Sequence, residues 1–201
     1  MAEHYFSPKP TSAEVRQRVT ITAWGSTFEI DSVAGVFAAG RLDKGTDVLF
    51  RQTTAPTAPG VFLDLGCGYG AITCALALAV PTAEVWAVDV NERGLALTRE
   101  NATRLGMGDR VHVALPDAVP DTLRFDEIWS NPPIHIGKPA LHALLLRWLS
   151  RLTDTGRAVL VVGKNLGSDS LQRWLTEQGF ACVRLGSAKG FRALEVRPRR
   201  H

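Results

Sequence analysis

Short apolar strands alternate with amphipathic helices from residue 61 onward, and this alternation constrains the fold more than any other feature of the chain. Strands are expected at residues 61–65, 84–90, 111–115, 125–129 and 157–162, and helices at residues 71–80, 91–105, 139–152 and 169–178. Two more strands, at residues 181–185 and 193–197, follow each other without a helix between them. The pattern predicts an α/β fold in which helices cover both faces of a mainly parallel sheet, and the last strand runs antiparallel.

The first 52 residues precede this alternating region. Alternating apolar residues on both sides of Gly25-Ser26 predict a β-hairpin, and the turn-rich run from residue 35 to 47 predicts a capping hairpin with a loop. The run from Gln52 to Gly60, rich in Thr, Ala and Pro, is typical of a linker. We therefore expect an N-terminal extension of residues 1–52, packed on a core of residues 53–201, and a single domain overall.

Composition and charge exclude few classes of protein. The formal net charge of +3 suits a nucleic-acid partner without requiring one, and the basic run Arg197–Arg200 is either a solvated tail or an RNA contact. Three cysteines without disulfide or metal-ligand spacing predict a reduced, cytoplasmic protein with no metal site. The longest apolar run, Ala71–Val80, is too short to cross a membrane, so no membrane partner is expected.

The carboxyl ends of the parallel strands are the expected location of the site, because open α/β sheets bind ligands there. The loop after the first of these strands reads DLGCGYGA, from Asp64 to Ala71, and its glycines let a ligand approach the backbone. Gly66, Gly68 and Ala71 match the relaxed dinucleotide fingerprint. Asp89 ends the next strand, where its carboxylate can accept hydrogen bonds from both hydroxyls of a ribose.

Asp64 distinguishes between two cofactors that fit this loop. A carboxylate at the loop entry repels a pyrophosphate, whereas S-adenosylmethionine carries a sulfonium and an ammonium group. The loop therefore favours S-adenosylmethionine, with a nicotinamide dinucleotide and a purely structural turn as alternatives. After the third strand, Asp117 can accept from an adenine amino group while the N–H of Ala118 contacts the ring, although a plain turn is the alternative for this pair.

The run SNPPIH, from Ser130 to His135, ends the fourth strand at a rigid corner, because two prolines cannot continue a helix or a central strand. The side-chain carbonyl of Asn131 and the main-chain carbonyl of Pro132 are two acceptors that suit a planar –NH₂ group. An amine held by both oxygens directs its lone pair outward, toward a sulfonium methyl, and needs no strong general base. We expect Asn131 and Pro132 to be catalytic; an Asn-capped tight turn is the structural alternative.

Six segments, in this order, give the chain a family likeness. They are HYFSPKP at His4, GVFAAGRLDKGT at Gly35, DLGCGYG at Asp64, VDVNERG at Val88, SNPPIHIGK at Ser130 and KGFRALEV at Lys189. Together they resemble the class I S-adenosylmethionine-dependent methyltransferases, and more narrowly the RsmC-like group of small-subunit rRNA guanine-N2 methyltransferases.

The resemblance implies a Rossmann-like, seven-stranded sheet in the order 3-2-1-4-5-7-6 and a guanine 2-amino group of ribosomal RNA as the target. It also implies that the loop Leu42–Thr46 lies near the methionine end of the cofactor. We count Thr46 and Cys67, which lie in the matching segments, among the cofactor-binding residues together with Asn131.

Two departures from the long members of the group concern the substrate. Long members carry an additional N-terminal domain, so this chain matches the short, single-domain branch. They also have Phe after the two prolines, where an aromatic ring can stack on a flipped base, and this chain has Ile134. The expected substrate-binding residues are Pro133, Ile134, His135 and Lys138, and weaker candidates for RNA contact are Lys164, Asn165, Tyr5, Phe6 and Lys9.

The sequence thus predicts an S-adenosylmethionine-dependent N-methyltransferase that acts on an exocyclic amine of ribosomal RNA. Because the corner at Asn131 suits any planar amine, adenine N6 and a protein glutamine amide are alternative targets. A non-catalytic domain that keeps the cofactor pocket and a nicotinamide-dependent oxidoreductase are alternatives from other classes. The sequence does not indicate an oligomeric state.

Overall fold

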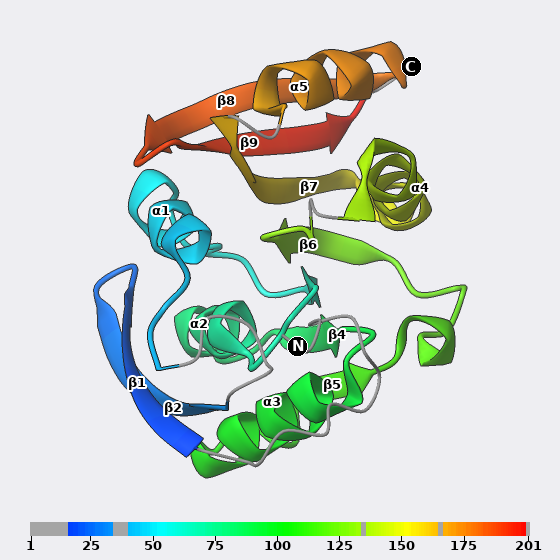
Figure 1. Cartoon of the computed structure of the whole chain (residues 1–201). Helices are drawn as coiled ribbons and strands as arrows, with labels where there is room; N and C mark the ends of the chain where they lie inside the picture. The colour runs from blue at the N-terminus through cyan, green and yellow to red at the C-terminus, as the bar shows by residue number, and fades with distance from the viewer. Residues whose placement is uncertain (1–15, 34–39, 134–135, 165–166, 200–201) are drawn as a thin grey trace.

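The main sheet of the computed structural model has the predicted strand order (Figure 1). The structure describes residues 16–33, 40–133, 136–164 and 167–199. The sheet strands are β3 (Val61–Leu65), β4 (Glu84–Val88), β5 (Val111–Ala114), β6 (Phe125–Ser130), β7 (Leu152–Gly163), β8 (Phe180–Ala188) and β9 (Phe191–Pro198). Their spatial order is β5-β4-β3-β6-β7-β9-β8, which is 3-2-1-4-5-7-6 when counted from β3. β9 is antiparallel to both of its neighbours, β7 and β8, and the other neighbouring pairs of this sheet are parallel, so the predicted topology is confirmed.

Helices cover both faces of this sheet and enclose an apolar core on each side (Figure 1). The helices are α1 (Lys44–Gln52), α2 (Ala71–Ala79), α3 (Glu92–Arg104), α4 (Lys138–Leu149) and α5 (Ser168–Glu177). Side chains alternate along each strand, so Phe62 packs in the core with α2 while Leu63 packs in the core with α4 and α5. Asp64 follows Leu63, and the same alternation turns its carboxylate toward α2.

The helix α1 corrects the prediction of a capping hairpin with a loop for residues 35–47, of which 35–39 lie outside the described residues. Asp43 caps the helix, because its Oδ1 accepts from the N–H groups of Gly45, at 2.7 Å, and Thr46, at 3.1 Å. Val48, Leu49 and Phe50 are then buried, and the helix packs against β7, β8 and β9. The turn-forming residues of this stretch therefore start a helix, and the predicted linker residue Gln52 is its last residue.

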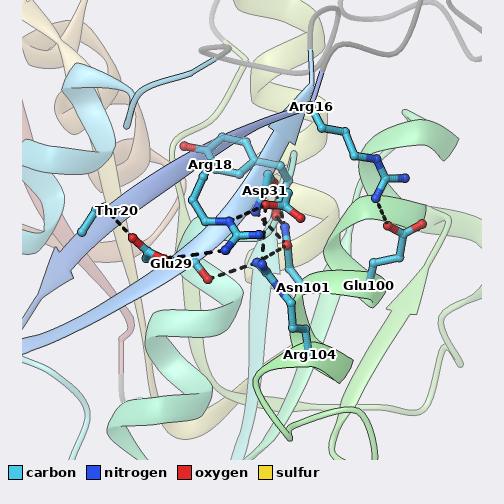
Figure 2. Close-up of polar contacts among 9 residues, drawn as sticks. Arg16, Arg18, Thr20, Glu29, Asp31, Glu100, Asn101 and Arg104 are labelled. Atoms are coloured by element: carbon cyan, nitrogen blue, oxygen red, sulfur yellow. Dashed lines mark hydrogen bonds and ion pairs between the residues drawn. The ribbon is translucent and has the colours of Figure 1, made fainter.

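The predicted N-terminal hairpin is present as β1 (Arg16–Ala23) and β2 (Ser26–Val33), which form a separate two-stranded sheet. Figure 2 shows how its polar side chains meet α3, with Arg18 and Arg104 both paired with Asp31. Asn101 of α3 also binds the backbone of Asp31 in both directions, each hydrogen bond being 2.9 Å long. The hairpin is thus fixed to the helices on one side of the sheet and does not extend the sheet edge.

The boundary between α4 and β7 also differs from the prediction. The helix ends at Leu149 and β7 begins at Leu152, whereas we expected a helix to residue 152 and a strand from residue 157. Leu152 is buried as a strand residue, and its apolar side chain had extended the apparent helical stripe. In the described segments, no helix is both long and apolar enough to cross a membrane.

Candidate active site

The corner at Asn131 lies at the carboxyl end of β6, in the middle of the sheet. Ser130, the last residue of β6, donates a 2.6 Å hydrogen bond from its hydroxyl to the carbonyl of Leu65, which ends the neighbouring strand β3. The ends of the two strands are therefore tied together. Pro132 is buried, and Pro133 and Asn131 are half-buried, so the corner is held by its surroundings while remaining open on one side.

The carboxamide of Asn131 is oriented by residues of α1. Its Nδ2 donates to Oδ1 of Asp43 at 2.6 Å and to Oγ1 of Thr46 at 3.2 Å. Its Oδ1 lies close to Gly45, 3.1 Å from the point where a side chain on that glycine would begin. Two of the predicted site residues, Asn131 and Thr46, are therefore in direct contact although they lie 85 residues apart.

Asp64, near the end of β3, is fully buried, and only one of its two carboxylate oxygens has a hydrogen-bond partner. Its Oδ2 accepts from the backbone N–H of Thr73 at 2.8 Å and from the Thr73 hydroxyl at 2.6 Å. Its Oδ1 is also buried and has no hydrogen-bond partner. Burial, with a smaller contribution from the nearby charge of Asp89, raises the pKa of Asp64 to about 7 in spite of the two hydrogen bonds from Thr73, which lower it. This carboxylate is therefore poised to accept a cation.

The glycine loop adopts backbone angles that favour glycine, with φ of 79° at Gly66 and 90° at Gly70. A side chain at Gly66 would meet only the ring of Pro133, 4.0 Å away, so this point of the loop faces open space next to the corner. The side chain of Cys67 is buried against Ala87 and Leu95, and this burial is the main reason why the pKa of its thiol is raised. Its thiol is a packing group, so only its backbone can take part in cofactor binding.

Asp89 supports the loop as well as bordering it. Its Oδ2 accepts from the N–H of Gly68 and its Oδ1 from the N–H of Asn91, both at 2.9 Å. The next residue, Val90, is 48% exposed, and Leu115, past the neighbouring strand β5, is 41% exposed. Two apolar side chains thus remain exposed past the ends of the adjacent strands β4 and β5.

Asp117 and Ala118 lie past β5 in a short 3₁₀ turn, and they are less closely bound to the site. The side chain of Asp117 is 92% exposed and accepts a 2.8 Å hydrogen bond from Arg147. The N–H of Ala118 donates to the carbonyl of Leu115 at 3.0 Å. Within the described residues, neither group forms a hydrogen bond with Asp64, Asp89 or Asn131, so their role in cofactor binding stays a prediction.

The substrate side of the corner is described only in part. Ile134, His135 and Asn165 lie outside the described residues, as do the candidates Tyr5, Phe6 and Lys9 and the end of the basic tail. Lys138 begins α4 and Lys164 follows β7, and both are exposed. The ammonium of Lys189, in the turn before β9, donates to Oδ2 of Asp47 at 2.7 Å, so this lysine is paired with α1. Lys138 and Lys164 are therefore the predicted RNA contacts that lie within the described residues.

Comparison with known proteins places the chain in a family. The profile of the methyltransferase small domain matches residues 27–195, which is most of the chain. The chain belongs to the methyltransferase small domain family. Family membership and the fold confirm the expected cofactor, S-adenosylmethionine, and the expected class of enzyme, a methyltransferase.

Relatives of this methyltransferase include proteins with and without a defined activity. An uncharacterized protein of Bacillus subtilis, YbxB, is 33% identical over 88% of this chain and 89% of its own. The ribosomal RNA small subunit methyltransferase C of Shewanella loihica is 34% identical over 80% of this chain and 47% of its own. The chain thus spans about half the length of this second relative.

Among solved structures, a 16S rRNA N2 methyltransferase (RsmC) of T. thermophilus, in complex with AdoMet and guanosine, has a TM-score of 0.77. It is 24% identical, and the match covers 95% of this chain and 52% of that one. A ribosomal protein L11 methylase of Lactobacillus delbrueckii has a TM-score of 0.64 at 22% identity, covering 79% of this chain. Identities this low show a shared fold.

Sequence reasoning did not single out three residues that the structure places beside the candidate site, namely Asp43, Val90 and Leu115. Asp43 lies inside the loop Leu42–Thr46 that the resemblance placed near the cofactor, and its position before a helix was the available signal of a cap. Val90 directly follows Asp89, and Leu115 ends a predicted strand. Their exposure has no sequence signal, because a strand-end valine or leucine is ordinarily expected to be buried.

Proposed function

We propose that this chain is an S-adenosylmethionine-dependent N-methyltransferase that acts on an exocyclic amine of ribosomal RNA, with the 2-amino group of guanine as the target. The observation that carries the proposal is the carboxamide of Asn131, whose Nδ2 is occupied by Asp43 and Thr46. Among the described residues none donates a hydrogen bond to its Oδ1, which leaves an acceptor at the strand end for the amine of a substrate.

The residues present fit the cofactor. The unpartnered Oδ1 of Asp64 suits the ammonium or sulfonium charge of S-adenosylmethionine, and the open space at Gly66 admits its methionine end beside the corner. Asp89 is placed for the ribose hydroxyls, because each carboxylate oxygen accepts more than one hydrogen bond. The exposed side chains of Val90 and Leu115 offer an apolar surface for the adenine ring.

Bound S-adenosylmethionine supplies an electrophilic methyl group, and the residues at the corner prepare the nucleophile. Oδ1 of Asn131 and the carbonyl of Pro132 accept the two N–H groups of the amine, so that its lone pair points away from both oxygens. The positive charge that develops on the nitrogen is stabilised by the same two oxygens. Since the methylated nitrogen is acidic, its proton is lost to water afterwards and no strong base is required.

A ribosomal RNA substrate is supported by the relatives and by the rim of the site. The Shewanella relative and the T. thermophilus structure are both ribosomal RNA methyltransferases by name. Lys138, at the start of α4, and Lys164, past the end of β7, are exposed, and they can contact the phosphates next to the target base.

The deciding experiment is mass spectrometric mapping of modified nucleosides in ribosomal RNA from cells with and without the gene. We expect one N2-methylguanosine to disappear without the gene and to return with the wild-type gene but not with Asn131→Ala. Loss of N6-methyladenosine instead would move the target to adenine. An unchanged RNA profile with a lost methyl group on a protein glutamine would replace RNA by protein as the substrate.

A further inference from the structure

The side chain of Asn131, which directly follows β6, is held by residues at the start of α1, a helix of the N-terminal extension. Oδ1 of Asp43 lies 2.6 Å from Nδ2 of Asn131, although the two residues are 88 positions apart in the sequence. Thr46 adds a second acceptor at 3.2 Å. The chain thus brings two oxygens to the amide nitrogen, one for each of its hydrogens.

This arrangement permits only one orientation of the carboxamide. The oxygen and the nitrogen of an asparagine side chain exchange places by a half-turn of the group, and the two forms have nearly the same shape. An ionised carboxylate accepts hydrogen bonds and cannot donate them, so Asp43 pairs with the –NH₂ end and repels the carbonyl end. The reversed carboxamide would also present –NH₂ to the amine of the substrate, which is itself a donor.

Asp43 combines this contact with the capping of α1. The same Oδ1 atom accepts from the N–H groups of Gly45 and Thr46, so three donors fix the position of the carboxylate. Gly45 makes the arrangement compact, since a side chain there would begin 3.0 Å from Oδ1 of Asp43 and 3.1 Å from both Oδ1 of Asn131 and the ring of Phe191. The cap, the carboxamide and the start of β9 therefore form one packed unit.

We propose that Asp43 is a positioning residue for methyl transfer: it orients the carboxamide of Asn131 so that Oδ1 faces the amine. The inference rests on the proposed function, because it concerns how the catalytic asparagine is presented. The negative charge of Asp43 also polarises the carboxamide through Nδ2, which makes Oδ1 a stronger acceptor for an amine that becomes positively charged.

Two substitutions separate this role from the capping of the helix. In Asp43→Ser the hydroxyl still caps α1, since serine and aspartate are similar as caps, but the shorter side chain no longer reaches Asn131. In Asp43→Asn the side-chain carbonyl can still accept from all three N–H groups. Asp47→Ser is the matched control, because Asp47 lies on the same helix and bonds to Arg51 and Lys189 rather than to Asn131.

We expect Asp43→Ser to lower kcat at least tenfold while the Kd of S-adenosylmethionine and the thermal unfolding temperature stay close to wild type. Asp43→Asn should recover most of the lost kcat, and Asp47→Ser should leave kcat unchanged. In the Asn131→Ala background, Asp43→Ser should have no further effect on kcat. A wild-type kcat in Asp43→Ser, or an equal loss in the Asn131→Ala background, would overturn the inference.

A second readout does not depend on activity. The side-chain –NH₂ signals of Asn131 can be assigned by NMR from their absence in Asn131→Ala, and their exchange with water measured in the cofactor-free protein. We expect exchange at least tenfold faster in Asp43→Ser than in wild type, and near-wild-type exchange in Asp43→Asn. If the wild type methylates no RNA, the proposed function fails and this exchange alone decides the role of Asp43: unchanged exchange in Asp43→Ser would refute it.

Discussion

The ends of β3 and β6 lie side by side in the sheet, yet the two polar side chains that they present are held in different ways. Asp64, near the end of β3, is fully buried and bonds to Thr73, which lies 9 residues away in the helix that follows. Asn131, just past β6, is half-buried and bonds to residues 85 and 88 positions away in the N-terminal extension. One end is arranged locally, and the other is assembled from a distant part of the chain.

This difference matches the two tasks that we propose. A cofactor pocket built on the glycine loop and on the ends of β3, β4 and β5 forms with the core of the domain. The acceptor for the substrate depends on the docking of α1, so it can vary without disturbing the cofactor pocket. Changes at the two strand ends should therefore have separable effects on binding and on turnover.

The largest effect is expected at the end of β6. Asn131→Ala removes the acceptor for the amine, and we expect kcat to fall about 10²- to 10³-fold, as for loss of one preorganised hydrogen-bonding group in other active sites. The Kd of S-adenosylmethionine, measured by calorimetry, should change less than threefold. Turnover close to wild type would refute the proposed mechanism and leave the fold unaffected.

The complementary change lies at the end of β3. Asp64→Asn keeps an acceptor for Thr73 but places a neutral –NH₂ at the unpartnered oxygen, and we expect at least tenfold weaker binding of S-adenosylmethionine. Binding of S-adenosylhomocysteine, which lacks the sulfonium charge but keeps the ammonium group, serves as the control. If both ligands bind the variant as tightly as wild type, Asp64 does not contact the cofactor.

Substitutions of two glycines should separate cofactor binding from turnover in the same way, with smaller effects. A side chain at Gly94 would begin 2.6 Å from the carbonyl of Gly68, so Gly94→Ala should displace α3 from the glycine loop. We expect a loss of about 1–3 kcal/mol in the free energy of unfolding, as for other overpacked sites, and about tenfold weaker cofactor binding.

Gly45→Ala should lower kcat with little change in cofactor affinity. The added methyl group would crowd Asp43, Asn131 and Phe191, which lie beside the proposed acceptor and not in the glycine loop. Steady-state kinetics and calorimetry on both variants check the pair. Equal losses of affinity in the two variants would show that the ends of β3 and β6 are not separable.

The last prediction concerns pH and stability rather than catalysis. Burial raises the pKa of Asp64 from 3.8 to about 7, so its protonated form stabilises the folded protein below pH 4 and this contribution is lost as the pH rises to about 7. Between pH 5 and pH 8, the wild type should lose about 3 kcal/mol relative to Asp64→Asn in urea unfolding of the cofactor-free protein. Parallel pH profiles for the two proteins would show that the carboxyl group titrates normally.

The sequence predicted the alternating strands and helices from local patterns, and the family resemblance supplied the order of the strands in the sheet. Strands such as residues 61–65 were recognisable from short apolar runs, and the position of the glycine loop and of Asn131 followed from the strands they end. The helix α1 was missed because Asp43, Gly45 and Thr46 are also turn formers, and the helix is stabilised by burial of Val48–Phe50 against distant strands.

The geometry of the site could not be predicted from the same patterns. The contact between Asp43 and Asn131 joins two segments with no shared periodicity, and only the docking of α1 on the sheet brings them together. The inward turn of Asp64 follows from strand alternation, but its unpartnered oxygen depends on the position of Thr73. Such details depend on tertiary packing, which overrides local propensity.

The packing of α1 has a consequence for synthesis of the protein. The helix lies against β7, β8 and β9 (Figure 1). The ring of Phe191, at the start of β9, lies next to Gly45. A ribosome makes α1 before β7, β8 and β9, so α1 has no complete surface to pack on until these three strands have been made. A chain truncated before β9 would retain the glycine loop and the strand-end carboxylates, but it would have no ordered acceptor for the amine. Catalytic competence would therefore arise only once β9 has been made.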